Sequence, residues 1–226
     1  MKSNKFLQVI TGCLMLFAAS LCRAEDLSAE EAKNFASTKG KELLMSFQEP
    51  DLAERYRQLD ALFMTYIDID YVSRFVLGRY WRQMSSDQRQ RYRDIFVRYG
   101  LAYYKTLPLD YAQNLTYEIK GVEQEGAFVN VATNVHVFLG NDSQDVTLIF
   151  RLHKVDGVIK AVDVKVAESS LLLAYRSKFY EMIAQDDGEI EWFLEDLEML
   201  ASSLEHSLNE NVSNQQNSLE FAAENG

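Results

Sequence analysis

Four side chains in this sequence are candidates for a general acid or base: Asp68, Asp70, Asp163 and His136. Around an apolar pocket they would suit a small secreted enzyme in which a carboxyl or imidazole group transfers a proton. Aspartate is also a favoured helix cap, and Asp68 and Asp70 stand where a helical pattern breaks, so capping is the better interpretation of that pair. The sequence gives little support to catalysis.

Metal ligands and nucleophiles are also scarce. The histidines at positions 136, 153 and 206 are far apart and show none of the close spacings that are typical of metal sites. Both cysteines lie within the first 24 residues, and no glycine-rich loop is suited to phosphate. We therefore expect no catalytic residue, no metal, no cofactor, and a protein that is not an enzyme.

The first 24 residues are typical of a cleaved export signal. Lys2 and Lys5 precede an apolar run over residues 6–21, which ends at Cys22-Arg23-Ala24. This run is shorter than the roughly 20 apolar residues of a membrane-spanning helix. A lipoprotein cleavage site at Cys13 is the alternative, but it leaves a shorter apolar core. We expect residues 1–24 to be removed, leaving an exported, soluble chain without a disulfide.

The charge of the chain is negative and uneven. The sequence has 34 acidic and 23 basic residues, and from Asp186 onward it has neither lysine nor arginine. Such a surface argues against a nucleic acid partner. We expect residues 25–208 to form a single domain with a core large enough to be stable without disulfides, and residues 209–226 to form a disordered acidic tail.

The stretch from Leu115 to Val166 organises the rest of the chain, because apolar and polar residues alternate there with the period of two that indicates β-strands. The alternation falls into four segments, which predicts a four-stranded antiparallel meander with one apolar face. Three-residue loops at 124–126 and 155–157, with a four-residue loop at 140–143, would keep the apolar residues of all four strands on that face.

Helical periodicity surrounds this predicted sheet. Apolar residues recur at spacings of three and four over residues 28–47, 50–66, 85–103, 172–183 and 190–204. Ser85 and Gln88 have the spacing of a capping box. The predicted fold is therefore α+β, with the meander packed against N-terminal and C-terminal helices.

One predicted helix and the segment before it carry a basic face. Only Asp87 and Asp94 are close to these arginines in the sequence. The face is either solvated surface or a contact site for an acidic partner or a lipid phosphate. Its members are Arg79, Arg82, Arg89, Arg91, Arg93 and Arg98.

Two blocks of the sequence resemble the MlaC family, whose members are also called toluene-tolerance proteins. The first is Phe75-Val76-Leu77-Gly78-Arg79-Tyr80-Trp81-Arg82, followed by Ser86-Asp87-Gln88. The second is Asp163-Val164-Lys165-Val166, which leads to Ser170-Leu171 and to Tyr175-Arg176-Ser177-Lys178-Phe179. The resemblance extends over about residues 29–200. Glu168 departs from it, because the family usually has glycine there.

The resemblance implies a monomeric periplasmic carrier that encloses phospholipid acyl chains in an apolar pocket. Such a carrier shuttles lipid between an outer-membrane lipoprotein–porin complex and an inner-membrane ABC transporter with its ring-forming lipid-binding subunit, and so maintains outer-membrane lipid asymmetry. A carrier of hopanoid or another apolar lipid is the alternative within the same superfamily.

The facing direction of the apolar residues then predicts which side chains line the pocket. Arg79, Arg82, Arg89, Arg91 and Arg93 are predicted to contact the head group or a partner protein. Strand residues are expected to form the floor and helix residues the walls. The predicted lining comprises Tyr71, Phe75, Phe96, Tyr99, Tyr103, Val129, Val131, Val135, Leu148, Phe150, Val164, Leu172, Tyr175 and Phe179.

Overall fold

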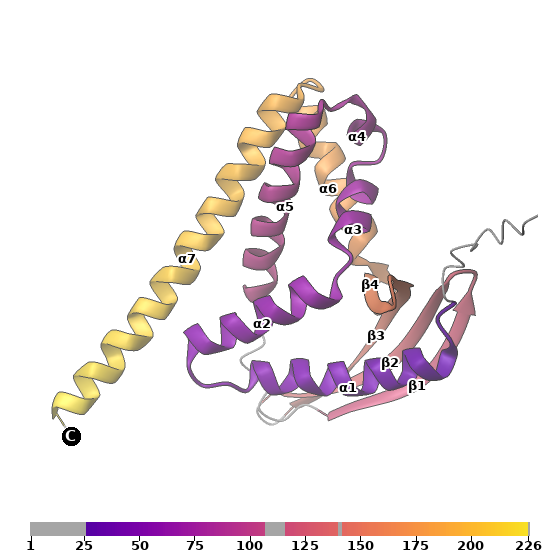
Figure 1. The fold of residues 1–226 in the computed structure, drawn as a ribbon. Coiled ribbons are helices and arrows are strands. Elements are labelled where there is room, and N and C mark those ends of the chain that lie inside the picture. Colours follow the sequence, from indigo (N-terminus) through magenta and orange to yellow (C-terminus); the bar gives the residue numbers. More distant parts are fainter. Residues whose placement is uncertain (1–25, 107–115, 140–141, 226) are drawn as a thin grey trace, which may run out of the picture.

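The computed structural model describes residues 26–106, 116–139 and 142–225 (Figure 1). The predicted signal peptide, Leu115 and residues 140–141 lie outside these ranges. The fold is α+β, as predicted, with one antiparallel sheet and helices before and after it. In the part of the chain that the structure describes, no helix is both long enough and apolar enough to cross a membrane.

Five strands follow one another across the sheet in chain order, so the meander is confirmed and gains one short strand. The strands are β1 Thr116–Glu125, β2 Phe128–Leu139, β3 Asp142–Val155, β4 Val158–Val166 and β5 Ser169–Ser170. The helices are α1 Ala29–Phe47, α2 Leu52–Tyr66, α3 Ile69–Leu77, α4 Arg79–Gln83, α5 Ser86–Lys105, α6 Leu171–Gln185 and α7 Ile190–Asn225.

The three-residue loops that we predicted are wrong. Glu125 pairs with Phe128 and Val155 pairs with Val158, so each turn has two residues. Asp156 and Gly157 both have positive φ, of 49° and 78°, as a type I′ turn requires. The middle connection is also shorter than predicted, because pairing continues to Leu139 and Asp142.

With the shorter turns alone, the apolar side chains of neighbouring strands would point to opposite faces of the sheet. Two bulges prevent this. The register of β1 against β2 shifts between Ile119 and Gly121, and that of β3 against β4 shifts between Arg151 and Leu152. Each bulge adds one residue to one strand, which has the same effect on side-chain parity as one more loop residue. The apolar residues therefore share one face as predicted, by a different route.

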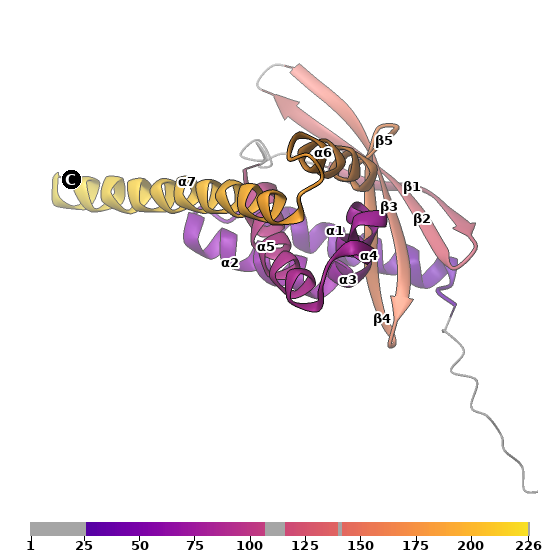
Figure 2. The same cartoon turned by 90° about the horizontal axis from the view of Figure 1, so that it is seen from above.

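Two large cores and a small third one, in which Phe47 of α1 packs against Leu59 of α2, hold the protein together. In the first, aromatic and aliphatic side chains of α3 to α7 pack around Tyr92, Phe179 and Phe193, whose exposed fraction is 0% for each. In the second, α1 packs on the sheet (Figure 1), and Ala32 meets strand residues such as Val131. Figure 2 shows the sheet on one side of the molecule and α5 and α7 on the other.

Helix α1 lies very close to the sheet at one point. The Tyr117 hydroxyl donates a hydrogen bond to the carbonyl oxygen of Ala36 at 3.1 Å. A β-carbon at Gly40 would lie 2.6 Å from the Tyr117 ring, so only glycine permits this approach. Ser28 caps the helix, and Glu31 links it to Lys154 of β3 through an ion pair of 2.8 Å.

The disordered tail that we predicted over residues 209–226 is wrong for residues 209–225, because α7 continues without a break to Asn225. No glycine or proline interrupts the sequence there, and Leu208 is buried. Gln215 accepts a hydrogen bond from the N–H of Leu52 and donates one to the carbonyl of Pro50, both at 2.8 Å. The helix thereby caps the start of α2.

Candidate functional site

The apolar face of the sheet has a closed half, which is covered by the protein itself. We use this name for Val129, Val131, Leu152 and Ala161, which are buried together under α1. Their exposed fractions range from 0% to 7%. Phe150 is half-buried and packs against the same core. These apolar side chains are therefore covered by contacts within the chain.

The same face continues into an open half, which comprises Val146, Leu148, Val164 and Val166. Leu148 pairs with Val166, and Val164 pairs with Phe150, so the register places all of them on the apolar face. Within the described residues, none of the four belongs to either buried core. Val166 is 39% exposed, and the other three are half-buried.

Helix α6 follows β5, which pairs with the end of β4, and Asp163 fixes the first turn of this helix. The carboxylate of Asp163 accepts hydrogen bonds from the Ser170 hydroxyl at 2.7 Å and from the Leu172 N–H at 3.0 Å. Ser170 in turn caps the helix by accepting from the Leu173 N–H. This first turn also exposes Leu171 and Leu173, at 41% and 55%. Because Asp163 alternates with Val164 along β4, its contacts with α6 lie on the opposite side of the sheet from the open half.

Tyrosines of α5 and α6 form the edge of the helical core. The rings of Tyr103 and Tyr175 lie 5.6 Å apart, and those of Tyr99 and Tyr175 lie 6.1 Å apart. Tyr103 remains 38% exposed. Burial raises the pKa of Tyr175, and the Tyr99 hydroxyl accepts a hydrogen bond of 2.8 Å from Lys178. These phenols join an apolar wall to polar surroundings.

The predicted lining falls into three groups in the structure. Phe96, Tyr99, Leu172, Tyr175 and Phe179 meet in the helical core, with Tyr103 stacked at its edge. Val129, Val131, Val135, Leu148, Phe150 and Val164 share the apolar face of the sheet.

Tyr71 and Phe75 form the third group. They stack on each other along α3, and Tyr71 contacts Phe128 and His153. Phe128 and His153 alternate with Val129 and Leu152, so Tyr71 lies against the other face of the sheet.

Val146 and Val166 were missed by our prediction of the lining. The alternation that selects Leu148 and Val164 also places Val146 and Val166 on the apolar face. That signal was present in the sequence, but it gives no information about which part of the face is left uncovered.

The family model described as "MlaC protein" matches residues 41–199, which is more than half of the chain. The chain belongs to the MlaC family. A solved structure of the phospholipid-binding protein from Ralstonia solanacearum, in complex with a phospholipid, is similar with a TM-score of 0.64 and 20% sequence identity. The match covers 76% of this chain and 98% of that one. No protein with a curated description matches.

Membership of the MlaC family and this structural likeness confirm the predicted family and fold class. Because the family model ends at residue 199, the distal part of α7 lies outside the match. The closed and open halves, in contrast, lie entirely within it.

The candidate catalytic residues of this MlaC-family chain have structural contacts. Asp68 caps α3 by accepting from the Tyr71 N–H at 2.9 Å, which confirms the capping interpretation for Asp68 but not for Asp70, and it lies 2.8 Å from His153. Asp70 pairs with Arg93. His136 pairs with Asp145, and Asp163 holds the start of α6. These four side chains lie in different contacts and form no shared site.

Three of the six arginines of the predicted basic face, Arg91, Arg93 and Arg98, form ion pairs within the chain. Arg91 contacts Glu191 at 3.0 Å and Glu198 at 3.6 Å, both in α7. Arg98 pairs with Glu198 and Glu205 in the same helix. The expectation that only Asp87 and Asp94 lie near these arginines is wrong, because α7 packs its acidic residues against α5.

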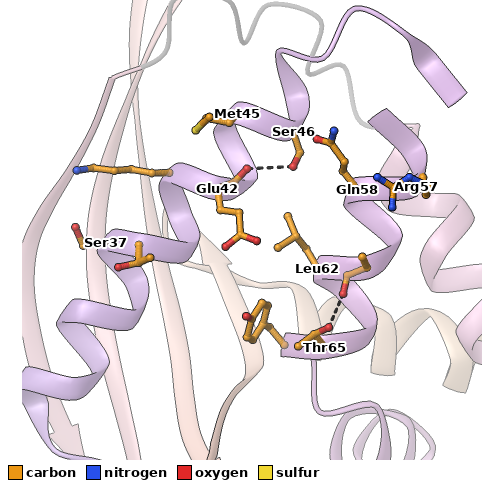
Figure 3. Close-up of a pocket in the computed structure, with 12 residues that line it drawn as sticks. Ser37, Glu42, Met45, Ser46, Arg57, Gln58, Leu62 and Thr65 are labelled. Carbon is orange, nitrogen blue, oxygen red and sulfur yellow. Dashed lines mark hydrogen bonds between the residues drawn. The ribbon is translucent and has the colours of Figure 1, made fainter. Parts of the chain in front are cut away.

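A surface hollow of about 620 Å³ lies between α1 and α2 (Figure 3). Its walls mix hydroxyl, charged and apolar side chains, including Glu42, Met45, Arg57 and Leu62. Ser46 and Thr65 donate hydrogen bonds to the backbone of their own helices. None of the predicted lining residues takes part in this hollow.

Proposed function

We propose that this protein is a periplasmic phospholipid carrier. The observation that carries the proposal is the open half of the apolar face, where Val166 is 39% exposed and Val146, Leu148 and Val164 are only half-buried. The structural neighbour from Ralstonia solanacearum, which binds a phospholipid, supports a lipid as the missing cover. Acyl chains would lie on the open half.

Transfer of acyl chains from water to the carrier is strongly favourable, whereas their transfer from a membrane to the carrier is nearly neutral in free energy. Two chains of about 16 carbons gain on the order of 25 kcal/mol when they leave water, at ~0.8 kcal/mol per methylene. A bilayer offers nearly the same free energy. The carrier therefore has to match the membrane and its partners closely enough for the lipid to move in either direction.

The cellular role follows from that balance. The carrier would shuttle phospholipid across the periplasm, as a monomer, between an outer-membrane lipoprotein–porin complex and an inner-membrane ABC transporter, and so maintain outer-membrane lipid asymmetry. Direction would come from the partners or from ATP that the transporter consumes. No covalent bond is made or broken by the carrier itself.

Native mass spectrometry of the purified mature protein, followed by organic extraction, tests the proposed cargo. We expect a mass increment that extraction resolves into diacyl phospholipids. Hopanoid in the extract would instead identify the protein as a carrier of another apolar lipid. A protein that is empty as purified, and stays empty after incubation with phospholipid vesicles, would contradict the proposal.

A further inference from the structure

Five arginines gather around α4, which Figure 1 places at the end of the helical bundle away from the sheet. We call this group the arginine tip. Each of its guanidinium groups either stacks on an aromatic ring of the same region or, for Arg82, extends from α4 at an exposed position. The members are Arg74, Arg79, Arg82, Arg89 and Arg176.

Stacking on aromatic rings holds the tip together. The guanidinium carbons of Arg74 and Arg89 lie 5.7 Å and 5.5 Å from the centre of the Trp81 ring. That of Arg79 lies 4.8 Å from the Tyr80 ring, and that of Arg176 lies 5.0 Å from the Phe75 ring. Cation–π contacts of this kind orient a guanidinium group without neutralising its charge.

Among the described residues, no carboxylate forms an ion pair with any of these five arginines. The other three arginines of α5 differ, because Arg91, Arg93 and Arg98 all have carboxylate partners. A local cluster of unneutralised positive charge therefore stands on a protein whose formal net charge is −11. Such a cluster attracts anions, and it orients the whole molecule toward them.

Backbone contacts make two of the arginines rigid. Arg89 Nε donates to the carbonyl of Trp81 at 3.0 Å, and Arg176 donates to the carbonyl of Phe75 at 3.3 Å. Gly78 permits this packing, because it has a φ of 51° and a β-carbon there would lie 2.5 Å from the Tyr180 hydroxyl. These two guanidinium groups are thus held in place before any partner arrives.

The composition of the tip favours a protein partner over a membrane. A membrane-binding surface inserts exposed apolar side chains among its basic residues. Here Phe75 and Trp81 are half-buried and Tyr80 is buried. Arginine with ordered tyrosine and tryptophan is instead typical of protein interfaces, and the planar guanidinium group matches a carboxylate.

We infer that the arginine tip is a docking surface for a partner protein that presents an acidic face. The inference rests on the proposed function only in that a carrier must meet partners, and it assigns them a surface that is separate from the open half. Arg74, Arg79 and Arg82 are the members that face a partner. Arg89 contacts the Trp81 ring on which Arg74 stacks, and Arg176 contacts the Tyr180 ring, over which Arg79 also lies.

Binding of fluorescein-labelled poly-L-glutamate to the full mature protein, measured by anisotropy at low ionic strength, tests this inference. The variant Arg74→Gln/Arg79→Gln/Arg82→Gln is expected to raise Kd at least about tenfold. The matched control Lys33→Gln/Lys41→Gln/Arg57→Gln removes as many charges from exposed positions on α1 and α2, and is expected to change Kd less than about twofold. Thermal unfolding of both variants checks that they fold.

Three results would overturn the inference: no binding of poly-L-glutamate by the unchanged protein, equal weakening in both variants, or tighter binding to phosphatidylglycerol vesicles through the same three arginines. Extraction of bound lipid from the same samples separates this test from that of the cargo. The arginine variant is expected to carry as much lipid as the unchanged protein, so a docking failure and an empty carrier give different results.

Discussion

The closed and open halves of the apolar face consist of the same kinds of residue on neighbouring parts of the same strands. Val131 and Leu152 are buried under α1, whereas Val166, on the same face, is 39% exposed. The two halves differ in what covers them. This comparison indicates that the closed half stabilises the fold and that the open half is available to a ligand.

The largest expected effect separates two leucines of β3 that share the apolar face. Leu152 is 1% exposed, so Leu152→Ala should lower the free energy of unfolding by about 2–5 kcal/mol through lost burial and a cavity. Leu148 is half-buried in the open half, so Leu148→Ala should cost less than about half as much in lipid-free protein. Urea unfolding of delipidated protein measures both values.

Equal losses for Leu152→Ala and Leu148→Ala would contradict the division of the face. They would mean that the open half is packed by the protein as firmly as the closed half, which leaves no apolar surface for an acyl chain.

A smaller effect concerns the attachment of α1 over the closed half. Hydrogen bonds from Lys154 and Ser28 lower the pKa of the Glu31 carboxyl to about 2. Because the folded-state pKa lies below the unfolded value, this contact stabilises the fold above about pH 4.5, and its contribution disappears as the pH falls toward 2. Glu31 is exposed, so the change should be modest.

The variant Lys154→Met removes the partner of Glu31 and should flatten that part of the pH profile. Urea midpoints at several pH values between about 5 and 2 measure it. Lys33→Gln, an exposed change on the same helix that leaves the contact between Lys154 and Glu31 in place, is the control. A profile that is as steep in Lys154→Met as in the unchanged protein would show that the contact between Lys154 and Glu31 is not the source.

The sequence was sufficient to predict the sheet and several helix caps because those features depend on local patterns. Alternation over residues 129–135 and the spacing of Ser85 and Gln88 are visible without a structure, and both are confirmed. The bulges after Ile119 and beside Leu152 were not predictable, since a two-residue turn with a bulge and a three-residue loop give the same parity.

Contacts between distant segments explain the remaining errors. Arg91 and Glu191 are 100 residues apart, and nothing in the sequence near Arg91 indicates that an acidic helix packs beside it. Likewise, the contacts of Gln215 with Pro50 and Leu52 are visible only in the folded chain. The division of the apolar face has the same origin, because the position of α1 over Val131 depends on packing and not on periodicity.

The most direct test of the account compares two valines of β4. Val166 lies in the open half and Val158 lies at the other end of the strand, with exposed fractions of 39% and 43%. Extraction and mass spectrometry of purified Val166→Trp and Val158→Trp would measure phospholipid bound per protein. We expect Val166→Trp to lose most of its lipid because the indole occupies the acyl-chain surface, and Val158→Trp to keep it. Equal lipid content in both variants would contradict the assignment of the open half as the lipid-binding surface.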